Sequence, residues 1–287
     1  MNEPFNVRRA RLSILIPTYR YAAGLERILS VLAPLPDDVE VLVFDDSPEP
    51  DLQAIIARFA KKMPRLSYRH NPTHSGASLG AGANWNALLE ASSGEYVLLM
   101  HHDEVPLDRD FLDLLRERLS RPDASDAYML DLMLVDEELR PIRRHTPRWM
   151  RRFVPGRTPT YLFRRNVIGP TGTMVIRRSV LPRFDPTLRW LIDVDFYVQL
   201  FQQNIDWMFE PDIRIGSVQR SEGSITASLS GRLGQIDAAE RRMLAGRYPK
   251  ARLWLGAPMG APIRWMETLA WGVLRTGMRL MSRMNVS

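Results

Sequence analysis

Residues 82–104 read GANWNALLEASSGEYVLLMHHDE, and this stretch decides the fold. Residues 84–91 have the apolar spacing of a helix, whereas residues 96–100 form a short apolar run that is typical of a buried strand. This run leads directly into the polar cluster at residues 101–104. A helix, a buried strand and then a polar cluster indicate an α/β protein whose ligands bind beyond the carboxyl ends of its strands.

The same alternation of helix and strand continues on both sides of this stretch. Polar residues follow two further apolar runs, at residues 17–20 and at residues 45–47. Strands that alternate with helices predict a mainly parallel sheet with helices on both faces. The further strands are predicted at residues 12–16, 39–44, 66–70 and 173–176, and the further helices at residues 23–32, 52–60 and from Trp190 onward.

Residues 143–165 differ in character, because they hold eight arginines and show little periodicity. We predict that they form a basic loop. The whole chain of 287 residues carries a net charge of +6, which predicts attraction to nucleic acid, to an anionic membrane surface or to a phosphorylated ligand. We expect no nucleic-acid partner, because the arginines gather in this loop and in one C-terminal helix, without an aromatic platform or a recognition-helix motif.

The composition limits the chemistry. With 45% apolar and 25% charged residues, the chain resembles an ordinary globular protein. Cysteine is absent, which excludes disulfides, thiolate metal sites and thiol nucleophiles, so any metal must bind oxygen or nitrogen ligands. The N-terminal apolar run is too short for a signal peptide, and we therefore expect a cytoplasmic protein.

Acidic residues mark three places where chemistry could occur. Asp103, in the cluster at residues 101–104, is a candidate ligand for Mg²⁺ or Mn²⁺, although a polar loop after a strand is also structurally ordinary. Asp193 begins a predicted helix, where the helix dipole favours an anionic carboxylate that could act as a general base; the alternative is a simple helix cap. Asp45 and Asp46 fit either a turn or contacts to a base or ribose.

Four segments resemble the successive signatures of family 2 glycosyltransferases, in the same order, across about residues 11–225. This resemblance implies a GT-A fold, which is a Rossmann-like, mainly parallel mixed sheet flanked by helices. It also implies a divalent metal, Mn²⁺ or Mg²⁺, a UDP-, GDP- or dTDP-linked sugar donor, and inversion at the anomeric carbon. The four segments are SILIPTYR (13–20), VEVLVFDDSPEPD (39–51), residues 82–104 and FDPTLRWLIDVDFY (184–197).

The resemblance assigns donor-binding roles in the first half of the chain. Pro17 and Tyr19 match the family's first nucleotide-binding loop, and Asp46 matches the second aspartate of a pair that contacts the base. Asn86 matches the asparagine that ends an Ala-Arg-Asn motif, whereas Trp85 stands where the family has arginine. The donor contact of that arginine is therefore in question.

The resemblance also assigns the metal and the base. Residues 101–104 occupy the place of the Asp-x-Asp motif, so Asp103 matches its metal-binding aspartate and His101 replaces its first aspartate. His102 lies inside this motif and is a donor-binding candidate. Asp193 aligns with the catalytic aspartate. Arg220 lies in a segment that resembles the part of the family covering the donor, and could approach the diphosphate or be a solvated surface residue.

We expect a catalytic domain at residues 1–258, with a nucleotide-sugar half at about 11–105 and an acceptor half at about 106–258. Residues 259–287 are predicted to form an amphipathic helix that lies on an anionic membrane surface or packs on protein. The expected acceptor is a sugar or a lipid-linked molecule. By analogy with the family, this implies surface polysaccharide or lipopolysaccharide assembly on the inner face of the cytoplasmic membrane.

The alternative to an enzyme is a catalytically silent protein of the same fold that binds nucleotide sugars or polyanions. A nucleotidyltransferase on a related fold would need a glycine-rich, basic loop after the first strand, and the sequence after residue 16 lacks one. Salt-sensitive binding to generic RNA without binding to UDP would favour the binding protein. Transfer from a nucleotide sugar distinguishes the enzyme from the silent binder.

Overall fold

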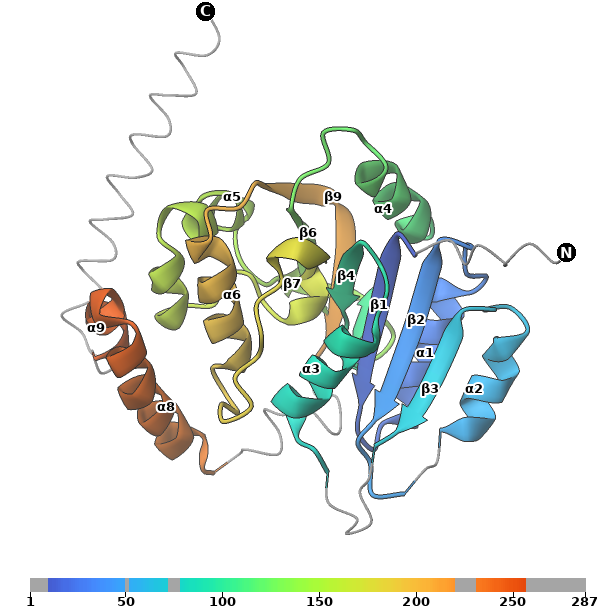
Figure 1. Ribbon diagram of the computed structural model, residues 1–287, viewed down its shortest axis with the longest axis horizontal. Helices are drawn as coiled ribbons and strands as arrows, with labels where there is room; N and C mark the ends of the chain where they lie inside the picture. The colour runs from blue at the N-terminus through green and yellow to red at the C-terminus, as the bar shows by residue number, and fades with distance from the viewer. Residues whose placement is uncertain (1–9, 50–51, 72–77, 220–230, 257–287) are drawn as a thin grey trace, which may run out of the picture. The chain divides into compact units, whose positions relative to one another are not determined.

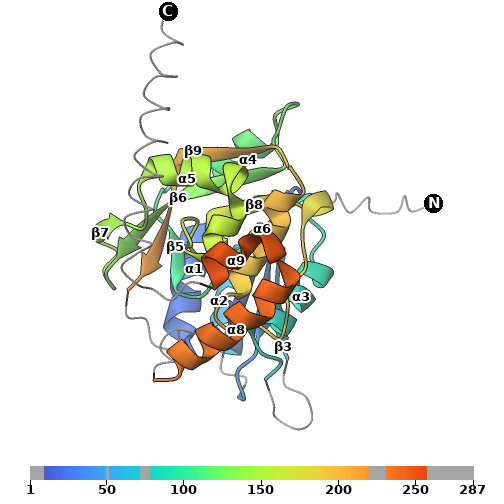
Figure 2. The same cartoon turned by 90° about the vertical axis from the view of Figure 1, so that its left-hand side faces the viewer.

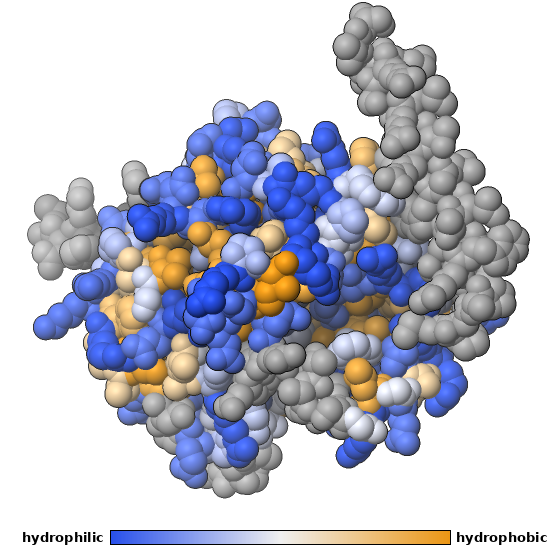
Figure 3. Space-filling view, turned by 180° about the vertical axis from the view of Figure 1, so that it is seen from behind, coloured by the Kyte–Doolittle hydropathy of each residue, from blue (hydrophilic) through white to orange (hydrophobic). Residues whose placement is uncertain are grey.

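The structure is a computed structural model that describes residues 10–49, 52–71, 78–219 and 231–256. Two compact units divide after Glu240, and each is considered by itself. The predicted helix at 259–287 and the candidate Arg220 lie outside the described residues. Among the described residues, no helix is both long enough and apolar enough to cross a membrane. Figure 3 shows one face of the molecule, on which hydrophilic residues predominate and hydrophobic residues form small groups between them.

A single mixed sheet forms the centre of the first unit (Figure 1). In the described residues its order is β3-β2-β1-β4-β8-β6-β9-β5, and β7 pairs with β6. Strands β3, β2, β1 and β4 are parallel to one another, whereas β8 is antiparallel to both β4 and β6. The strands are β1 Leu12–Thr18, β2 Val39–Asp45, β3 Leu66–His70, β4 Tyr96–Leu99, β5 Glu104–Pro106, β6 Ala127–Val135, β7 Pro141–Arg144, β8 Met174–Arg177 and β9 Trp207–Val218.

Helices cover the parallel part of the sheet on both faces. Figure 1 shows α3 beside β1, below β4, and α1 partly hidden behind β2 and β3. The helices are α1 Ala22–Leu32, α2 Gln53–Ala60, α3 Ala81–Ala91, α4 Phe111–Leu119, α5 Arg148–Arg157, α6 Ile192–Gln202, α8 Leu233–Arg247 and α9 Arg252–Leu255. Short 3₁₀ turns are η1 Pro159–Phe163, η2 Thr171–Thr173, η3 Arg178–Val180 and η4 Pro249–Ala251.

The core follows from the apolar pattern of the elements that the sequence predicts. Every residue of β1 is buried, as expected for a central strand covered on both faces. In α1 the buried Leu25, Ile28, Leu29 and Leu32 repeat at helical spacing. Truncating one of these buried leucines to alanine would lower the free energy of unfolding by about 2–5 kcal/mol. The strands and helices predicted near residues 12, 23, 39, 52, 66, 84, 96, 173 and 190 are therefore confirmed.

The basic loop predicted at residues 143–165 is wrong, because this stretch contains the end of β7, the helix α5 and the turn η1. The inward side of α5 includes Arg151, which is fully buried. Its guanidinium donates hydrogen bonds to the carbonyl oxygens of Ile168 (2.6 Å) and Leu130 (2.5 Å). An arginine at an inward position hides the apolar period of the helix, which is why the pattern resembled a loop.

Candidate active site

The polar segments that the sequence singles out gather at one edge of the sheet. Strands β1 and β2 are parallel with Thr18 opposite Asp45, and β4 lies on the other side of β1 with Leu99 opposite Leu15. Because parallel strands end at a common edge, the loops after β1, β2 and β4 meet there. The structure thus brings together residues 17–20, 45–47 and 101–104.

The proposed nucleotide loop is built around Asp46. Its two carboxylate oxygens accept hydrogen bonds from the backbone N–H groups of Leu79 (2.8 Å) and Gly80 (2.9 Å), immediately before α3. The backbone N–H of Asp46 donates to the carbonyl oxygen of Thr18 at 3.0 Å, which ties this residue to the end of β1. In the loop after β1, Pro17 is buried and Tyr19 is 37% exposed. A stacking surface therefore lies beside a fixed carboxylate.

Two asparagines of α3 have different contacts. Asn86 donates to the carbonyl oxygen of Phe184 (2.9 Å) and accepts the N–H of the same residue (3.0 Å), so it joins α3 to the segment before α6. Asn84, which the sequence analysis does not single out, is buried. It donates to the carbonyl oxygen of Phe44 at 3.2 Å and accepts a hydrogen bond from Asn71 at 2.7 Å. Asn84 thus links the end of β2, through Phe44, to Asn71 after β3.

His101 stands at the centre of the cluster after β4. Its Nδ1 lies 3.3 Å from Glu104 Oε1, and its Nε2 lies 3.2 Å from the hydroxyl of Thr171. Burial opposes a charged ring, but the neighbouring carboxylate of Glu104, and those of Asp103 and Asp193, together raise the pKa of His101. The geometry therefore favours an imidazolium ion at this position.

The residues present fit a divalent metal. Ligand atoms of His101, Asp103 and Glu104 lie within 4.8 Å of one another, and they offer the oxygen and nitrogen ligands that such ions bind. Glu104 is buried, and its Oε1 accepts no hydrogen bond from the described residues. Gly172 makes room for this carboxylate, because a Cβ atom there would lie 1.8 Å from Glu104 Oε2. The sequence analysis assigned metal binding to Asp103, and the structure adds His101 and Glu104 as candidates.

His102 points to the other side of the cluster, toward the loop after β1. Its ring meets that of Tyr21 edge-on, with ring centroids 5.3 Å apart. Its Nδ1 is buried and has no hydrogen-bond partner among the described residues. Burial lowers the pKa of His102, whereas the neighbouring carboxylates raise that of His101.

Asp193 lies in the first turn of α6 and is partly buried. Its Oδ1 accepts the N–H of Val194 at 2.8 Å, and its Oδ2 accepts a hydrogen bond from Asn166 Nδ2, also at 2.8 Å. Burial raises the pKa of Asp193 to about 6, partly opposed by the Val194 N–H and by His101. A carboxylate with this pKa is ionised at neutral pH but still basic enough to accept a proton.

Asn166, which the sequence analysis did not identify, holds the carboxylate of Asp193. Its Oδ1 accepts the N–H groups of Ile168 (3.1 Å) and Gly169 (2.9 Å), and its Nδ2 also donates to the carbonyl oxygen of Gly169 at 3.1 Å. Gly169 has φ +98°, a conformation that favours glycine. This tight turn fixes the amide of Asn166 and hence the orientation of Asp193.

Glu240 holds the chain just before α6. The buried carboxylate of this α8 residue accepts the backbone N–H groups of Arg189 (2.6 Å), Trp190 (3.1 Å) and Leu191 (2.8 Å). These groups precede the first helical residue, Ile192, and would otherwise lack acceptors. The position of the α6 N-terminus, and with it that of Asp193, is thus fixed by a second residue that carries no recognisable motif.

Trp85 and His101, two residues at which the sequence departs from the family's motifs, are in contact. Their ring centroids lie 4.7 Å apart at an interplanar angle of 30°. Trp85 is buried and also meets Phe184 edge-on at 4.9 Å. Two aromatic rings packed at this distance make a favourable contact. Trp85 therefore forms one wall of the site and supports the ring of His101.

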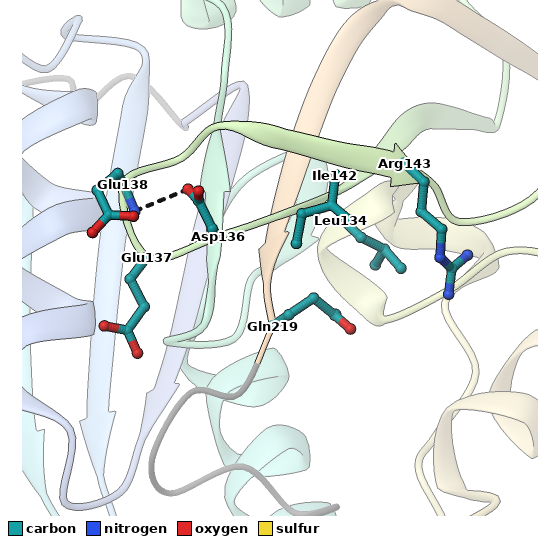
Figure 4. A pocket seen from close by; sticks show the side chains of 7 residues that line it. All are labelled: Leu134, Asp136, Glu137, Glu138, Ile142, Arg143 and Gln219. Atoms are coloured by element: carbon teal, nitrogen blue, oxygen red, sulfur yellow. Dashed lines mark hydrogen bonds between the residues drawn. The ribbon is translucent and has the colours of Figure 1, made fainter.

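A cavity of about 450 Å³ lies away from this cluster, at the β6–β7 hairpin and the end of β9 (Figure 4). Its apolar part is formed by Leu134 and Ile142. Asp136, Glu137 and Glu138 stand at the hairpin turn, and Arg143 stands at the opposite end of β7. Three carboxylates would repel a diphosphate. This cavity is therefore unsuited to a nucleoside diphosphate.

Comparison with solved structures defines the fold as GT-A type. The chain is similar to TarS of Staphylococcus aureus, solved with UDP-GlcNAc, with a TM-score of 0.61 and 19% identity over 85% of this chain and 74% of that one. It is also similar to the mannosyltransferase PcManGT of Pyrobaculum calidifontis, solved with GDP-Man and Mn²⁺, with a TM-score of 0.55 and 18% identity over 91% of this chain and 70% of that one. These likenesses concern the fold.

The sequence comparisons define the family. The model of glycosyl transferase family 2 matches residues 13–184, and the chain belongs to this family. An uncharacterized glycosyltransferase of Nostoc sp. is 30% identical over 96 residues, which are 33% of this chain and only 29% of that relative. The chain thus belongs to glycosyl transferase family 2 and has a GT-A fold, as the sequence analysis expected.

Proposed function

We propose that this glycosyltransferase inverts the anomeric carbon of a nucleoside diphosphate sugar while transferring the sugar to an acceptor hydroxyl. The observation that carries the proposal is Asp193, a partly buried carboxylate with a pKa of about 6, held by Asn166 at the start of α6. The nucleotide sugars bound by TarS and PcManGT support the class of donor. We expect a UDP-, GDP- or dTDP-linked sugar.

In the proposed reaction Asp193 accepts the proton of the acceptor hydroxyl as its oxygen forms a bond to the anomeric carbon. The bond from that carbon to the diphosphate oxygen breaks, and the nucleoside diphosphate leaves with the electron pair. A single displacement of this kind inverts the configuration. Asp46 with Tyr19 would bind the nucleotide of this leaving group.

A divalent metal would be held by Asp103 with His101 and Glu104, and when bound it would neutralise charge on the departing diphosphate. We expect Mn²⁺ or Mg²⁺. The presence of Mn²⁺ in PcManGT supports this choice. We expect His102 and Asn86 to shape the donor pocket, His102 through its unpaired Nδ1 and Asn86 through the backbone of Phe184. The acceptor is proposed to be a sugar or a lipid-linked molecule of polysaccharide assembly.

The test is transfer or hydrolysis of UDP-, GDP- and dTDP-sugars with Mn²⁺, Mg²⁺ or a chelator, with the anomeric configuration of the product read by NMR. We expect Asp193→Asn to lose at least about a hundredfold in kcat while it still binds donor. Asp206→Asn, an exposed aspartate outside the site, is the matched control. Near wild-type turnover of Asp193→Asn with bound donor would rule out this residue as the base.

A further inference from the structure

The charge of the chain is distributed unevenly. Residues 140–184 contain twelve arginines and no aspartate or glutamate. Because the whole chain has a net charge of +6, the remaining residues carry a net charge of −6. A basic segment of this density within an otherwise acidic protein indicates a surface that meets an anionic partner.

Seven of the twelve arginines form two groups that differ in their contacts. Arg177 and Arg183 form ion pairs with carboxylates of other elements, and they support the fold. A second group is exposed on β7 and α5, and we call it the α5 surface. Its members are Arg143, Arg144, Arg148, Arg152 and Arg157. Figure 2 shows α5 turned toward the viewer, at the outside of the fold.

The α5 surface has too few negative charges to balance it. Arg144 and Arg148 both bind the same oxygen of Asp131, although their side chains remain 42% and 44% exposed. Asp131 is fully buried, so its charge is fixed beneath the surface. Within the described part of the chain, Arg143, Arg152 and Arg157 form no ion pair. Together with Asp131 the five arginines keep a net charge of about +4, and the carboxylates of Asp136, Glu137 and Glu138 stand at the other end of β7, at the hairpin turn.

Aromatic side chains lie between these arginines. On α5, Trp149 and Phe153 are four residues apart and half-buried, beside Arg148 and Arg152 with the same spacing. The guanidinium groups of Arg152 and Arg157 lie 5.9 Å and 5.3 Å from the ring centroid of Phe153. This interleaving of cations and amphipathic rings is typical of a helix at a membrane interface.

The neighbouring strand extends the same mixture of side chains. Ile142 of β7 is 56% exposed, next to Arg143. A surface that served only soluble phosphate would not need apolar groups between its cations. A lipid headgroup layer offers phosphates together with a boundary into which rings and aliphatic side chains can insert.

We propose that the α5 surface binds the phosphate headgroups of an anionic lipid membrane. The proposal does not depend on the glycosyl transfer proposed above, because membrane binding is measured without donor or acceptor. It also does not depend on residues 259–287, since substitutions on α5 leave that segment unchanged. It would place the enzyme at a membrane by a surface of the catalytic fold itself.

The test is flotation of the full chain with phosphatidylcholine vesicles, with and without phosphatidylglycerol, at low and high salt. We expect flotation only with phosphatidylglycerol, weakening as salt rises. Each arginine near an anionic surface contributes about fivefold to the membrane affinity. The double variant Arg152→Glu with Arg157→Glu should therefore weaken vesicle binding by about 30-fold or more. Lys61→Glu with Lys62→Glu, exposed residues after α2 with the same change in charge, should weaken it by less than about threefold.

Several outcomes would overturn the proposal. These are equal flotation of the α5 and control variants, flotation that ignores phosphatidylglycerol, or salt-sensitive binding to an RNA oligonucleotide or to inorganic phosphate without flotation. Thermal melting of each variant shows whether it is folded. If the double variant does not fold, Arg143→Glu on β7 supplies a second test, because its side chain has no carboxylate partner among the described residues. Unchanged flotation of that variant would equally contradict the proposal.

Discussion

Replacing Asn166 with aspartate tests whether Asp193 acts as the base and whether Asn166 controls it. Asn166 presents two different atoms: Oδ1 accepts the N–H groups of Ile168 and Gly169, and Nδ2 donates to Asp193 Oδ2 at 2.8 Å. Asn166→Asp keeps an acceptor for both N–H groups of the turn, although it loses the hydrogen bond from Nδ2 to the carbonyl oxygen of Gly169. It exchanges the donor for a second carboxylate oxygen, so that the contact with Asp193 becomes repulsive.

The size of the effect follows from this contact. A hydrogen bond to a charged acceptor contributes about 1.5–3 kcal/mol, and one pKa unit corresponds to about 1.4 kcal/mol. Its loss should raise the pKa of Asp193 by about one unit or more above the value of about 6 that burial already sets. His101, Glu104 and Tyr197 also face this carboxylate and are unchanged in the variant. A base must be unprotonated, so activity should fall as pH drops through this higher pKa.

The assay is kcat as a function of pH at saturating donor and acceptor. For Asn166→Asp we expect the acid limb to move up by at least about one pH unit, with activity largely recovered near about pH 9. Asn166→Ala removes both the donor and the acceptor and should show a smaller shift together with a lower melting temperature. If Asn166→Asp lowered activity equally at every pH, with its acid limb at the wild-type position, Asn166 would have only a structural role.

Three further predictions concern the supports of the site. At about pH 7.5 Asp193→Asn should raise the melting temperature by a few degrees although it removes activity. Burial raises the pKa of Asp193 to about 6, so at pH values above 6 the ionised carboxylate lowers the stability of the fold by up to about 3 kcal/mol. An unchanged or lower melting temperature would contradict this prediction. Glu240→Ala should lower the free energy of unfolding by about 2–4 kcal/mol in urea titration, since it leaves three N–H groups without their acceptor, and Glu240→Gln should lower it less. Gly172→Ala should weaken Mn²⁺ binding at least about tenfold by calorimetry, because the new Cβ would displace Glu104, while Gly234→Ala, with no atom within 4 Å, should leave it unchanged.

The sequence predicts the parallel half of the sheet well, because its strands are short continuous apolar runs whereas its helices repeat apolar residues at helical spacing. It does not predict β6, whose apolar run is interrupted by Asp131. That carboxylate is stable in the interior only because Arg144 and Arg148 reach it from β7 and α5. The same pairing explains why a stretch rich in arginine folds as a strand and a helix. Because the charge of Asp131 is balanced by arginines of two other elements, the sequence around it shows no local pattern that predicts a buried strand.

The candidate site shows the same division. Asp46, Asp103 and Asp193 follow strands or begin helices, and their positions could be predicted from those boundaries. Asn166 and Glu240 could not, because each acts through a tertiary contact with a different segment. Asparagine in a turn and glutamate in a helix are common residues in common places. Only their partners in the fold give them a role.

The contact between Trp85 and His101 also bears on how this site changes during evolution. The family's motifs place an arginine and an aspartate at these two positions, and in this chain the two rings lie 4.7 Å apart. His101→Asp alone would set a carboxylate against the negative face of an indole, and Trp85→Arg alone would set a guanidinium against a cationic imidazole. We therefore expect Trp85 and His101 to be energetically coupled, so that reverting both positions together should cost less than the two single reversions added.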